Sequence, residues 1–326
     1  MLINDINKVK EFLPVNKSLE FDKLKPFVVD AERMVSEIID GDFYNDLVVY
    51  DSDPDHEVND YFDKLIVKLQ DSISFLAFHL GFDIMNTVFS NQGMHRIEND
   101  ESGKKALFSR QEENLKRGFK LLGYNKLDLA FEYMEKNKAQ FPTWVASDAY
   151  TLSRQHFINS TREFSAIYNI NNSRLVFMKV KSAQTLVEDF DIKPLIGIDY
   201  YDELKEQVAT DSLSDANKAF MIYLQKAVAY QTIFRTGPGL IIELNEFGMY
   251  QTEFETNLNN VKKEGAVAFS IASAIIDIAG ITGNSYLKSC ESFLKKNIDD
   301  YPLYANSDAY DDSGDVIEGT DKIVVI

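Results

Sequence analysis

The ten residues "FPTWVASDAY" (141–150) return in altered form near the other end of the chain, as "YPLYANSDAY" (301–310). Five of the ten positions are identical, and the first and fourth are aromatic in both stretches. In a chain of 326 residues, the two stretches stand about half a chain length apart. Two explanations are open: a short site that is used twice, or a whole domain that occurs twice.

Sliding the second half of the sequence onto the first extends this match, in the same order, along most of the chain. "GDFYNDL" from Gly41 pairs with "IDYYDEL" from Ile198, and "LQDSISF" from Leu69 pairs with "LQKAVAY" from Leu224. "FSNQGMHR" (89–96) pairs with "LNEFGMYQ" (244–251). The offset drifts only from 155 to 160 residues, far above the roughly 20–50 residues of a solenoid repeat.

The repeat therefore indicates a tandem duplication of one domain. We predict a first domain over residues 1–150, a linker over 151–156, a second domain over 157–310, and an acidic C-terminal arm over 311–326.

Each copy is predicted to be mainly helical, with one small β-hairpin. Apolar residues recur at helical spacing over residues 19–39 and along a long helix from Tyr61 to Leu80. Short helices are expected at 5–13 and 160–168, and a hairpin is expected to turn near Gly93 and Gly248. Two helices should close each copy, at 110–122 and 127–137, and at 256–279 and 286–297. "RTGPGL" (235–240) is interpreted as a turn between helix and strand.

The composition excludes several classes of protein. The apolar content of 45% supports well-filled cores, and the single cysteine, Cys290, cannot form an internal disulfide. Its neighbours Leu287 and Phe293 favour a small core residue. "MLINDINKVKEFL" lacks the pattern of a secretory signal. No apolar run reaches the roughly 18 residues that a membrane span needs, so no membrane partner is predicted.

No catalytic, cofactor-binding or metal-binding residues are predicted. The sequence contains neither a glycine-rich phosphate loop nor a dinucleotide fingerprint. "DSDPDHE" (51–57) resembles a calcium loop but places His56 where glycine is required and Phe62 where glutamate is required. The four histidines lack ligand spacing, and His79, between Phe78 and Leu80, is interpreted as a core or interface residue. An enzyme is therefore disfavoured.

The strongest candidates are interface residues. Trp144 and Tyr304 occupy the same slot of the two copies, where a large amphipathic ring either caps its own core or anchors an interface. The Gly-Met pairs of the two strand regions, Gly93 with Met94 and Gly248 with Met249, are further candidates.

The C-terminal arm differs from anything in the first copy. From Asp299 to Ile326 the chain has eight acids and one base, within a net charge of −18. The arm ends in the apolar residues Ile323, Val324, Val325 and Ile326. Such an end suggests strand addition to a neighbouring subunit, and a frayed terminus remains the alternative.

The stretch "INDINKVKEFLPVNKSLEFDKLKPFVVDAERMVSEIIDGDFYNDL" (3–47), a long amphipathic helix and "FSNQGMHR" together resemble a family from tailed phages of gut Bacteroidetes, crAss-like phages included. Members of that type are similar to head–tail connector, or adaptor, proteins. The resemblance implies a homo-oligomeric ring, a dodecamer, under the portal protein in the virion, with other neck or tail proteins as partners. The protein would be made in the host cytoplasm.

Two hypotheses remain open from the sequence. The first is a structural ring protein whose lumen passes double-stranded DNA without specific binding. A net charge of −18 suits that role, because a basic lumen would hold the phosphates. The second is a cytoplasmic enzyme or regulatory ligand-binding module with a site in only one of the two copies.

Overall fold

The computed structural model describes residues 1–15, 19–85, 87–90, 93–96, 109–245, 248–251 and 264–310. These residues are mainly helical, which confirms the predicted fold class. The described residues divide into two compact units, one within residues 1–153 and 171–176 and one within residues 154–170 and 177–310. The predicted linker, 151–156, begins within a helix, and the predicted arm, 311–326, lies outside the described residues.

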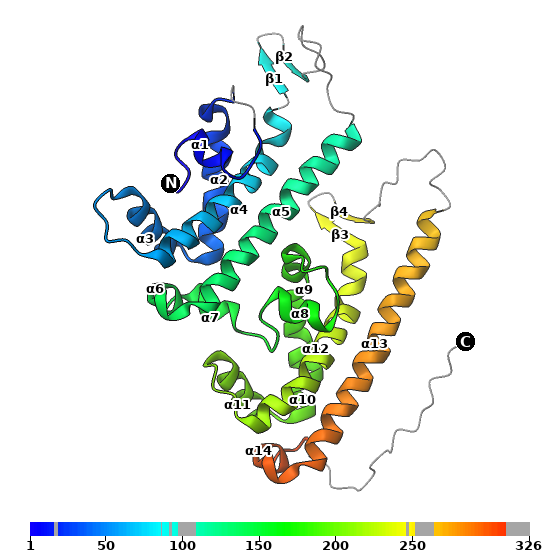
Figure 1. Cartoon of the computed structure of the whole chain (residues 1–326). Coiled ribbons are helices and arrows are strands. Elements are labelled where there is room, and N and C mark those ends of the chain that lie inside the picture. Colours follow the sequence, from blue (N-terminus) through cyan, green and yellow to red (C-terminus); the bar gives the residue numbers. More distant parts are fainter. Residues whose placement is uncertain are drawn as a thin grey trace. The chain divides into compact units, whose positions relative to one another are not determined.

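The first copy is built around two long helices, α4 and α5, that pack along each other, with α2 against α4 (Figure 1). Its elements are α1 (Ile6–Lys10), α2 (Phe21–Ile39), α3 (Gly41–Ser52), α4 (Asp60–Met85), β1 (Thr87–Ser90), β2 (Gly93–Arg96), α5 (Ser109–Lys136), a 3-10 turn (Lys138–Gln140), α6 (Pro142–Val145) and α7 (Asp148–Ser153). The helix expected at 5–13 is shorter. It starts after Asp5, whose carboxylate accepts the backbone N–H of Asn7 at 2.6 Å.

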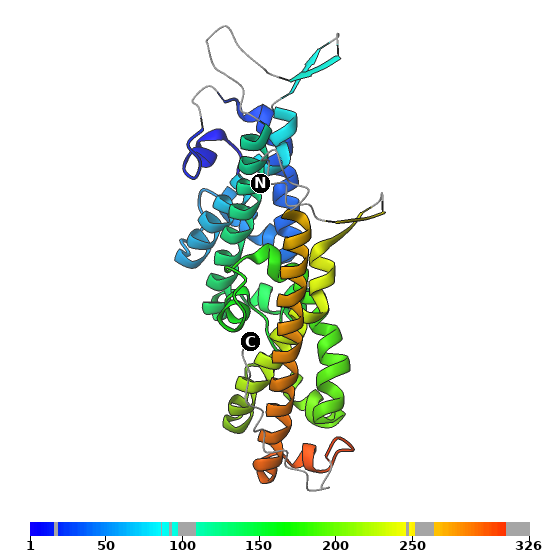
Figure 2. The ribbon, with the colours of Figure 1, turned by 90° about the vertical axis from the view of Figure 1, so that its right-hand side faces the viewer.

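The second copy repeats this order, which confirms the tandem duplication. Its elements are α8 (Thr161–Ile167), α9 (Arg174–Val187), a π-helix (Glu188–Ile192), α10 (Lys193–Ile196), α11 (Ile198–Ala209), α12 (Asp215–Ile241), β3 (Ile242–Asn245), β4 (Gly248–Gln251), α13 (Glu264–Lys296), a 3-10 turn (Ile298–Asp300) and α14 (Pro302–Ala305). Both views show α12 and α13 side by side (Figures 1 and 2).

A two-stranded antiparallel ladder follows the central helix of each copy. In the first, Ser90 lies opposite Gly93. In the second, Asn245 lies opposite Gly248. The registers are equivalent, so the two Gly-Met pairs begin the second strand of each ladder.

The prediction of two closing helices in each copy is wrong, because α5 and α13 each run through their glycines without interruption. A Cβ on Gly123 would lie 2.7 Å from the Leu76 side chain, and one on Gly283 would lie 2.9 Å from that of Gln231. These glycines permit close packing of two helices rather than ending one.

The turn predicted at 235–240 is wrong for the same reason. α12 continues to Ile241, and a Cβ on Gly237 would collide with the side chain of Ile276.

The second copy contains one extra residue in the helix that corresponds to α2. The offset between the copies is 156 at Ser18 and Arg174 but 157 at Gly41 and Ile198. In between, the helical path of α9 and α10 passes through a π-helix, Glu188–Ile192. A single inserted residue is the usual origin of a π-bulge, so the insertion is absorbed without ending the helical path.

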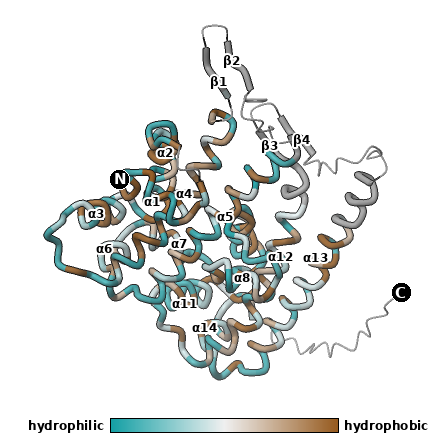
Figure 3. Tube along the Cα trace, turned by 45° about the horizontal axis from the view of Figure 1, so that its top comes forward, coloured by the Kyte–Doolittle hydropathy of each residue, from teal (hydrophilic) through white to brown (hydrophobic). Residues whose placement is uncertain are grey.

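Each long helix buries one face, and hydrophobic and hydrophilic positions alternate along α4 and α5 (Figure 3). By length and composition α4 could cross a membrane, but 61% of its most apolar window is buried inside the protein. It supplies Leu65, Leu69, Ile73 and Leu76 to the core of the first copy. The burial identifies α4 as the central helix of a packed bundle.

Candidate functional site

Trp144 and Tyr304 are both fully buried, at the same place in the two copies. Trp144 lies in α6 with its ring 4.8 Å from that of Tyr150, and Tyr304 lies in α14 with its ring 5.7 Å from that of Tyr310. Each aromatic residue therefore closes its own bundle. Of the two sequence-based interpretations, the structure supports the core cap, because a fully buried ring has no surface to offer a partner.

The other interface candidates do not gather at one site in the described structure. Gly93 and Met94 begin β2, whereas Gly248 and Met249 begin β4. The apolar tip, Ile323–Ile326, lies outside the described residues. A role for these residues in contacts between subunits stays a prediction.

A buried carboxylate fixes the start of the first copy. Glu32, on α2, is only 6% exposed, and its Oε1 accepts the backbone N–H of Ile3 at 2.9 Å. Gln70, on α4, donates its side-chain amide to the Leu2 carbonyl oxygen at 2.8 Å, and Lys8 donates to the same oxygen at 3.0 Å. Buried polar groups cost free energy unless they are hydrogen-bonded. These bonds therefore anchor the N-terminal segment to the two helices.

The second copy repeats this arrangement with different residues. Oε1 of Glu188, which is 2% exposed, accepts the backbone N–H of Phe157 at 2.8 Å. Gln225 on α12, the counterpart of Gln70, donates to the Phe157 carbonyl oxygen at 2.9 Å. The start of each copy is thus held in the same way.

The two carboxylates differ in their charged neighbours. The Glu188 Oε2 is 2.6 Å from the Lys205 ammonium, and its Oε1 is 3.4 Å from His156 Nδ1. Burial acts to raise the pKa of Glu188, but His156 and Lys205 together hold this pKa below its usual value. Burial raises the pKa of Glu32, and the hydrogen bond from Ile3 offsets this only in part. Both groups are fully engaged inside the fold, so they act on stability rather than on a ligand.

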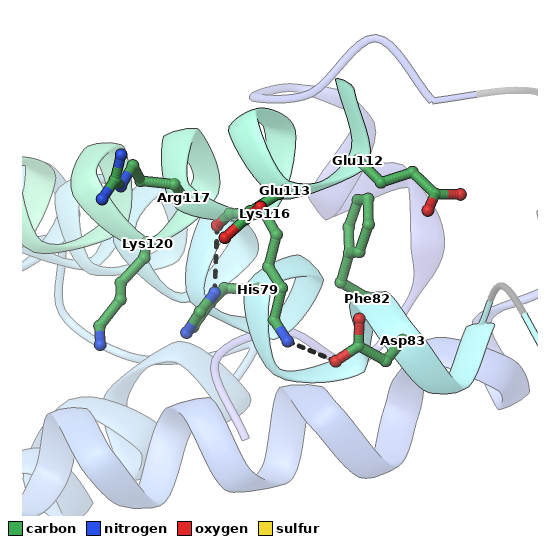
Figure 4. Close-up of a pocket in the computed structure, with 8 residues that line it drawn as sticks. All are labelled: His79, Phe82, Asp83, Glu112, Glu113, Lys116, Arg117 and Lys120. Carbon is green, nitrogen blue, oxygen red and sulfur yellow. Dashed lines mark hydrogen bonds and ion pairs between the residues drawn. The ribbon is translucent and has the colours of Figure 1, made fainter. Parts of the chain in front are cut away.

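A polar hollow of about 510 Å³ opens between α4 and α5 of the first copy (Figure 4). Its lining residues are His79, Phe82, Asp83, Glu112, Glu113, Lys116, Arg117 and Lys120. Figure 4 shows Arg117 and Lys120 at one end and Glu112 and Asp83 at the other. Lys116 crosses the hollow and forms an ion pair with Asp83. The hollow therefore has a basic end and an acidic end.

His79 is half-buried at the basic end. Its Nδ1 lies 3.1 Å from the Lys116 carbonyl oxygen, which can only accept, so the hydrogen is on Nδ1 and Nε2 carries the lone pair. Burial lowers the pKa of His79, and the nearby Lys120 and Lys116 lower it further. The ring is consequently neutral near pH 7. Its predicted assignment, a hydrogen-bonded core or interface histidine, fits this geometry.

At the corresponding place of the second copy, the two long helices α12 and α13 lie against each other. At the offsets of the repeat, Phe234 replaces His79 and Gly280 replaces Lys120. A Cβ on Gly280 would be 2.7 Å from the Phe234 ring, so the two helices are in direct contact there. Asp277 stands where Arg117 stands in the first copy, which reverses the charge. Within the described part of the chain, the polar hollow is thus a feature of the first copy.

The last long helix of each copy also exposes large aliphatic side chains. On α5, Leu115, Leu122 and Leu129 recur every seven residues, and Leu122 is 43% exposed. On α13, Ile275 and Ile278 occupy the equivalent face, and Ile278 is 61% exposed. We call these the aliphatic faces of α5 and α13. Contiguous exposed apolar residues commonly mark surfaces that bind another protein.

Two further features of the described residues concern metal binding and the thiol of Cys290. No group of His, Cys, Asp and Glu within these residues could hold a metal ion. Cys290 is buried, as predicted for a core residue, and burial raises the pKa of its thiol to about 12. A thiol with so high a pKa is not nucleophilic at neutral pH.

The chain belongs to the family described as "Family of unknown function (DUF6712)", whose pattern matches it twice, at residues 35–154 and 192–314. The two matches fall on the two copies found from the sequence. Comparisons with curated proteins and with solved structures yield no match.

Sequence reasoning missed both the buried carboxylates and the hollow. For Glu32 a signal existed, since an acid stands inside the apolar stripe of residues 19–39 and another at the paired position, Glu188. The hollow gave no comparable signal. Its residues come from two helices, and only their packing brings His79 to Lys116.

Proposed function

We propose that this protein is a structural ring component of the head–tail junction of a tailed phage. Copies of the chain assemble laterally between portal and tail and leave a channel for DNA, without catalysis. The resemblance to connector proteins supports this proposal and implies the dodecamer and the virion location. Membership of the DUF6712 family neither adds to it nor opposes it.

The observation that carries the proposal is the equivalent aliphatic face on each copy. A ring needs two complementary surfaces per subunit that do not coincide, because head-to-tail contacts close a ring whereas self-complementary contacts stop at a dimer. A duplicated domain offers such a pair at once, with Leu122 on one copy and Ile278 on the other. Burial of exposed leucine and isoleucine side chains contributes roughly 25 cal/mol per Å².

The charge of the chain is consistent with a DNA conduit. A net charge of −18 repels phosphates, so DNA would pass without the salt-dependent affinity that a basic lumen produces.

The assembly can be tested with one pair of variants and a control. Native mass spectrometry of the full chain, alone and with portal protein, should show a closed ring for the wild type. Ile278→Lys and Leu122→Lys should each shift the population towards monomer, because a buried, unpaired ammonium disfavours the contact. Val58→Lys, at a residue 74% exposed in the loop before α4, is the matched control. A stable monomer that never joins portal or tail proteins would refute the proposal.

The polar hollow favours a second candidate, a ligand-binding regulatory module or enzyme with its site in the first copy only. A ligand that binds the folded state alone raises its apparent stability. A thermal-shift screen of metals and small anions, repeated on Lys116→Ala, therefore separates the two candidates. A ligand whose stabilisation disappears in the variant would favour this second function over the ring.

A further inference from the structure

The basic end of the hollow is built from two cations that have no ion-pair partner among the described residues. Arg117 and Lys120 both lie on α5 and line the hollow. Lys116, beside them in sequence, is already paired with Asp83. In a chain of net charge −18, two adjacent cations of this kind are available for an anionic partner.

An exposed apolar residue extends this basic end. Leu121 follows Arg117 by four positions on α5, which places the two side chains on the same helix face, and it is 40% exposed. The corresponding part of α13 has Ile281 exposed as well, but there Asp277 replaces the arginine. A surface that is both basic and apolar therefore exists on the first copy and not at the equivalent place on the second.

The chain itself contains a segment of complementary chemistry. The segment "DDSGDVIEGTDKIVVI" (311–326) has five acids, one base and six aliphatic residues. Sixteen residues in extended conformation span at most about 55 Å, long enough to leave one subunit and reach along the next. The single base, Lys322, can meet the acidic end of the hollow while the acids meet Arg117 and Lys120.

We propose that the surface formed by Arg117, Lys120 and Leu121, together with the hollow beside it, binds the acidic segment 311–326 of a neighbouring copy. The inference rests on the proposed ring, and it names the contact that would link successive subunits. It also gives a physical reason for the difference between the copies. Each subunit has one acidic arm to donate, so one receptor site per subunit is sufficient.

Zero-length coupling of amines to carboxylates tests the contact in the full-length chain. Equal amounts of ¹⁵N-labelled and unlabelled chain are mixed, allowed to exchange subunits, treated with a carbodiimide and digested for mass spectrometry. We expect Lys116 or Lys120 joined to an acid between Asp311 and Asp321, in pairs of mixed isotope composition. Arg117→Glu keeps both lysines and should lower this yield several-fold, whereas Arg33→Glu, at an exposed arginine of α2, should not.

Each other outcome overturns the inference. Coupled pairs of a single isotope composition mean that the arm binds its own chain. If native mass spectrometry of the same sample shows a ring but no coupling occurs, the inference fails and the proposed function stands. If no ring forms, both the inference and the proposed function fail. A fluorescently labelled DNA duplex that binds the wild type but not Arg117→Glu would assign the surface to phosphate instead.

Discussion

Glu32 and Glu188 each accept a backbone N–H at the start of their own copy, from Ile3 and Phe157, but only Glu188 has a lysine ammonium beside it. Lys205 lies 2.6 Å from Glu188. In the first copy, the lysine that contacts the N-terminal segment is Lys8, and it pairs with Asp51, at 2.8 Å, rather than with Glu32. Both copies thus keep a buried carboxylate that accepts a backbone N–H, but the charges around it differ. A contact that occurs in both copies can therefore depend on charge in one copy and on desolvation in the other.

The largest expected effect is the loss of the Glu188 charge. Glu188→Gln can still accept the Phe157 N–H but leaves Lys205 without its carboxylate, at a cost of about 3 kcal/mol to the second unit. Glu32→Gln should change the stability of the first unit by less than about 1 kcal/mol, because the weaker hydrogen bond to Ile3 is offset by the relief of burying a charge. Hydrogen exchange resolved by peptide measures each unit separately. Glu206→Gln, at an exposed position of α11, is the control. Equal losses in both units would contradict the proposed difference between the two carboxylates.

A second contrast lies at the junction before α3 and α11. Gly197 has φ +83°, and a Cβ there would stand 2.5 Å from Ser307, so Gly197→Ala should destabilise the second unit by about 2 kcal/mol. Asp40 occupies the equivalent place with φ 103° and caps the Phe43 N–H at 3.0 Å. Asp40→Gly relieves strain and loses the cap, so the first unit should change by less than about 1 kcal/mol. A large loss for Asp40→Gly would show that the cap outweighs the strain. Urea unfolding of both variants provides the measurement.

Gly123 and Gly283 lie at equivalent helix contacts of the two copies but face different side chains. Gly123→Ala brings a Cβ to 2.7 Å from the Leu76 side chain and 3.2 Å from its backbone nitrogen. The first unit should lose about 1 kcal/mol. Gly283→Ala meets the movable end of Gln231, so the gain in helix propensity roughly cancels the crowding. Thermal unfolding of the two variants should rank them in this order, and the reverse order would contradict the packing argument.

The smallest expected effect is an opposite pH dependence of the two units. A carboxyl with a raised folded pKa takes up a proton on folding, so the Glu32 contribution grows as the pH falls from neutral towards 4.5. The pKa of Glu188 is lowered, so its contribution is complete above pH 4.5 and is lost as the pH falls below it. The difference between wild type and each Glu→Gln variant, measured from about pH 2.5 to pH 8, isolates the two contributions. Parallel profiles would mean that charge balance does not distinguish the copies.

Much of the fold could be predicted because both copies carry the same local patterns. The stripe over residues 19–39 predicts α2, and the apolar residues from Tyr61 to Leu80 predict α4. The closing helices could not be predicted correctly. A glycine within a helical pattern marks either an end or a close contact, and only the opposing residue decides which. The side chain of Leu76, 47 positions before Gly123, lies against this glycine, so Gly123 marks a close helix contact and not a helix end.

The candidate site was less predictable than the fold. The sequence placed Trp144 and Tyr304 in one slot but left their role open, and burial decided it. For the hollow, His79 and Lys116 stand on different helices, and no periodicity connects them.

A mainly helical, duplicated and strongly acidic chain follows from the residues alone, because helix periodicity and charge are properties of short stretches that can be counted. The packing of the helices determines which glycines lie at helix contacts, which carboxylate has a cation beside it, and in which copy the polar hollow forms. Those outcomes depend on contacts between residues far apart in the chain, such as Gln70 with Leu2. Their free energies come from burial and pairing, which exist only once the helices have packed.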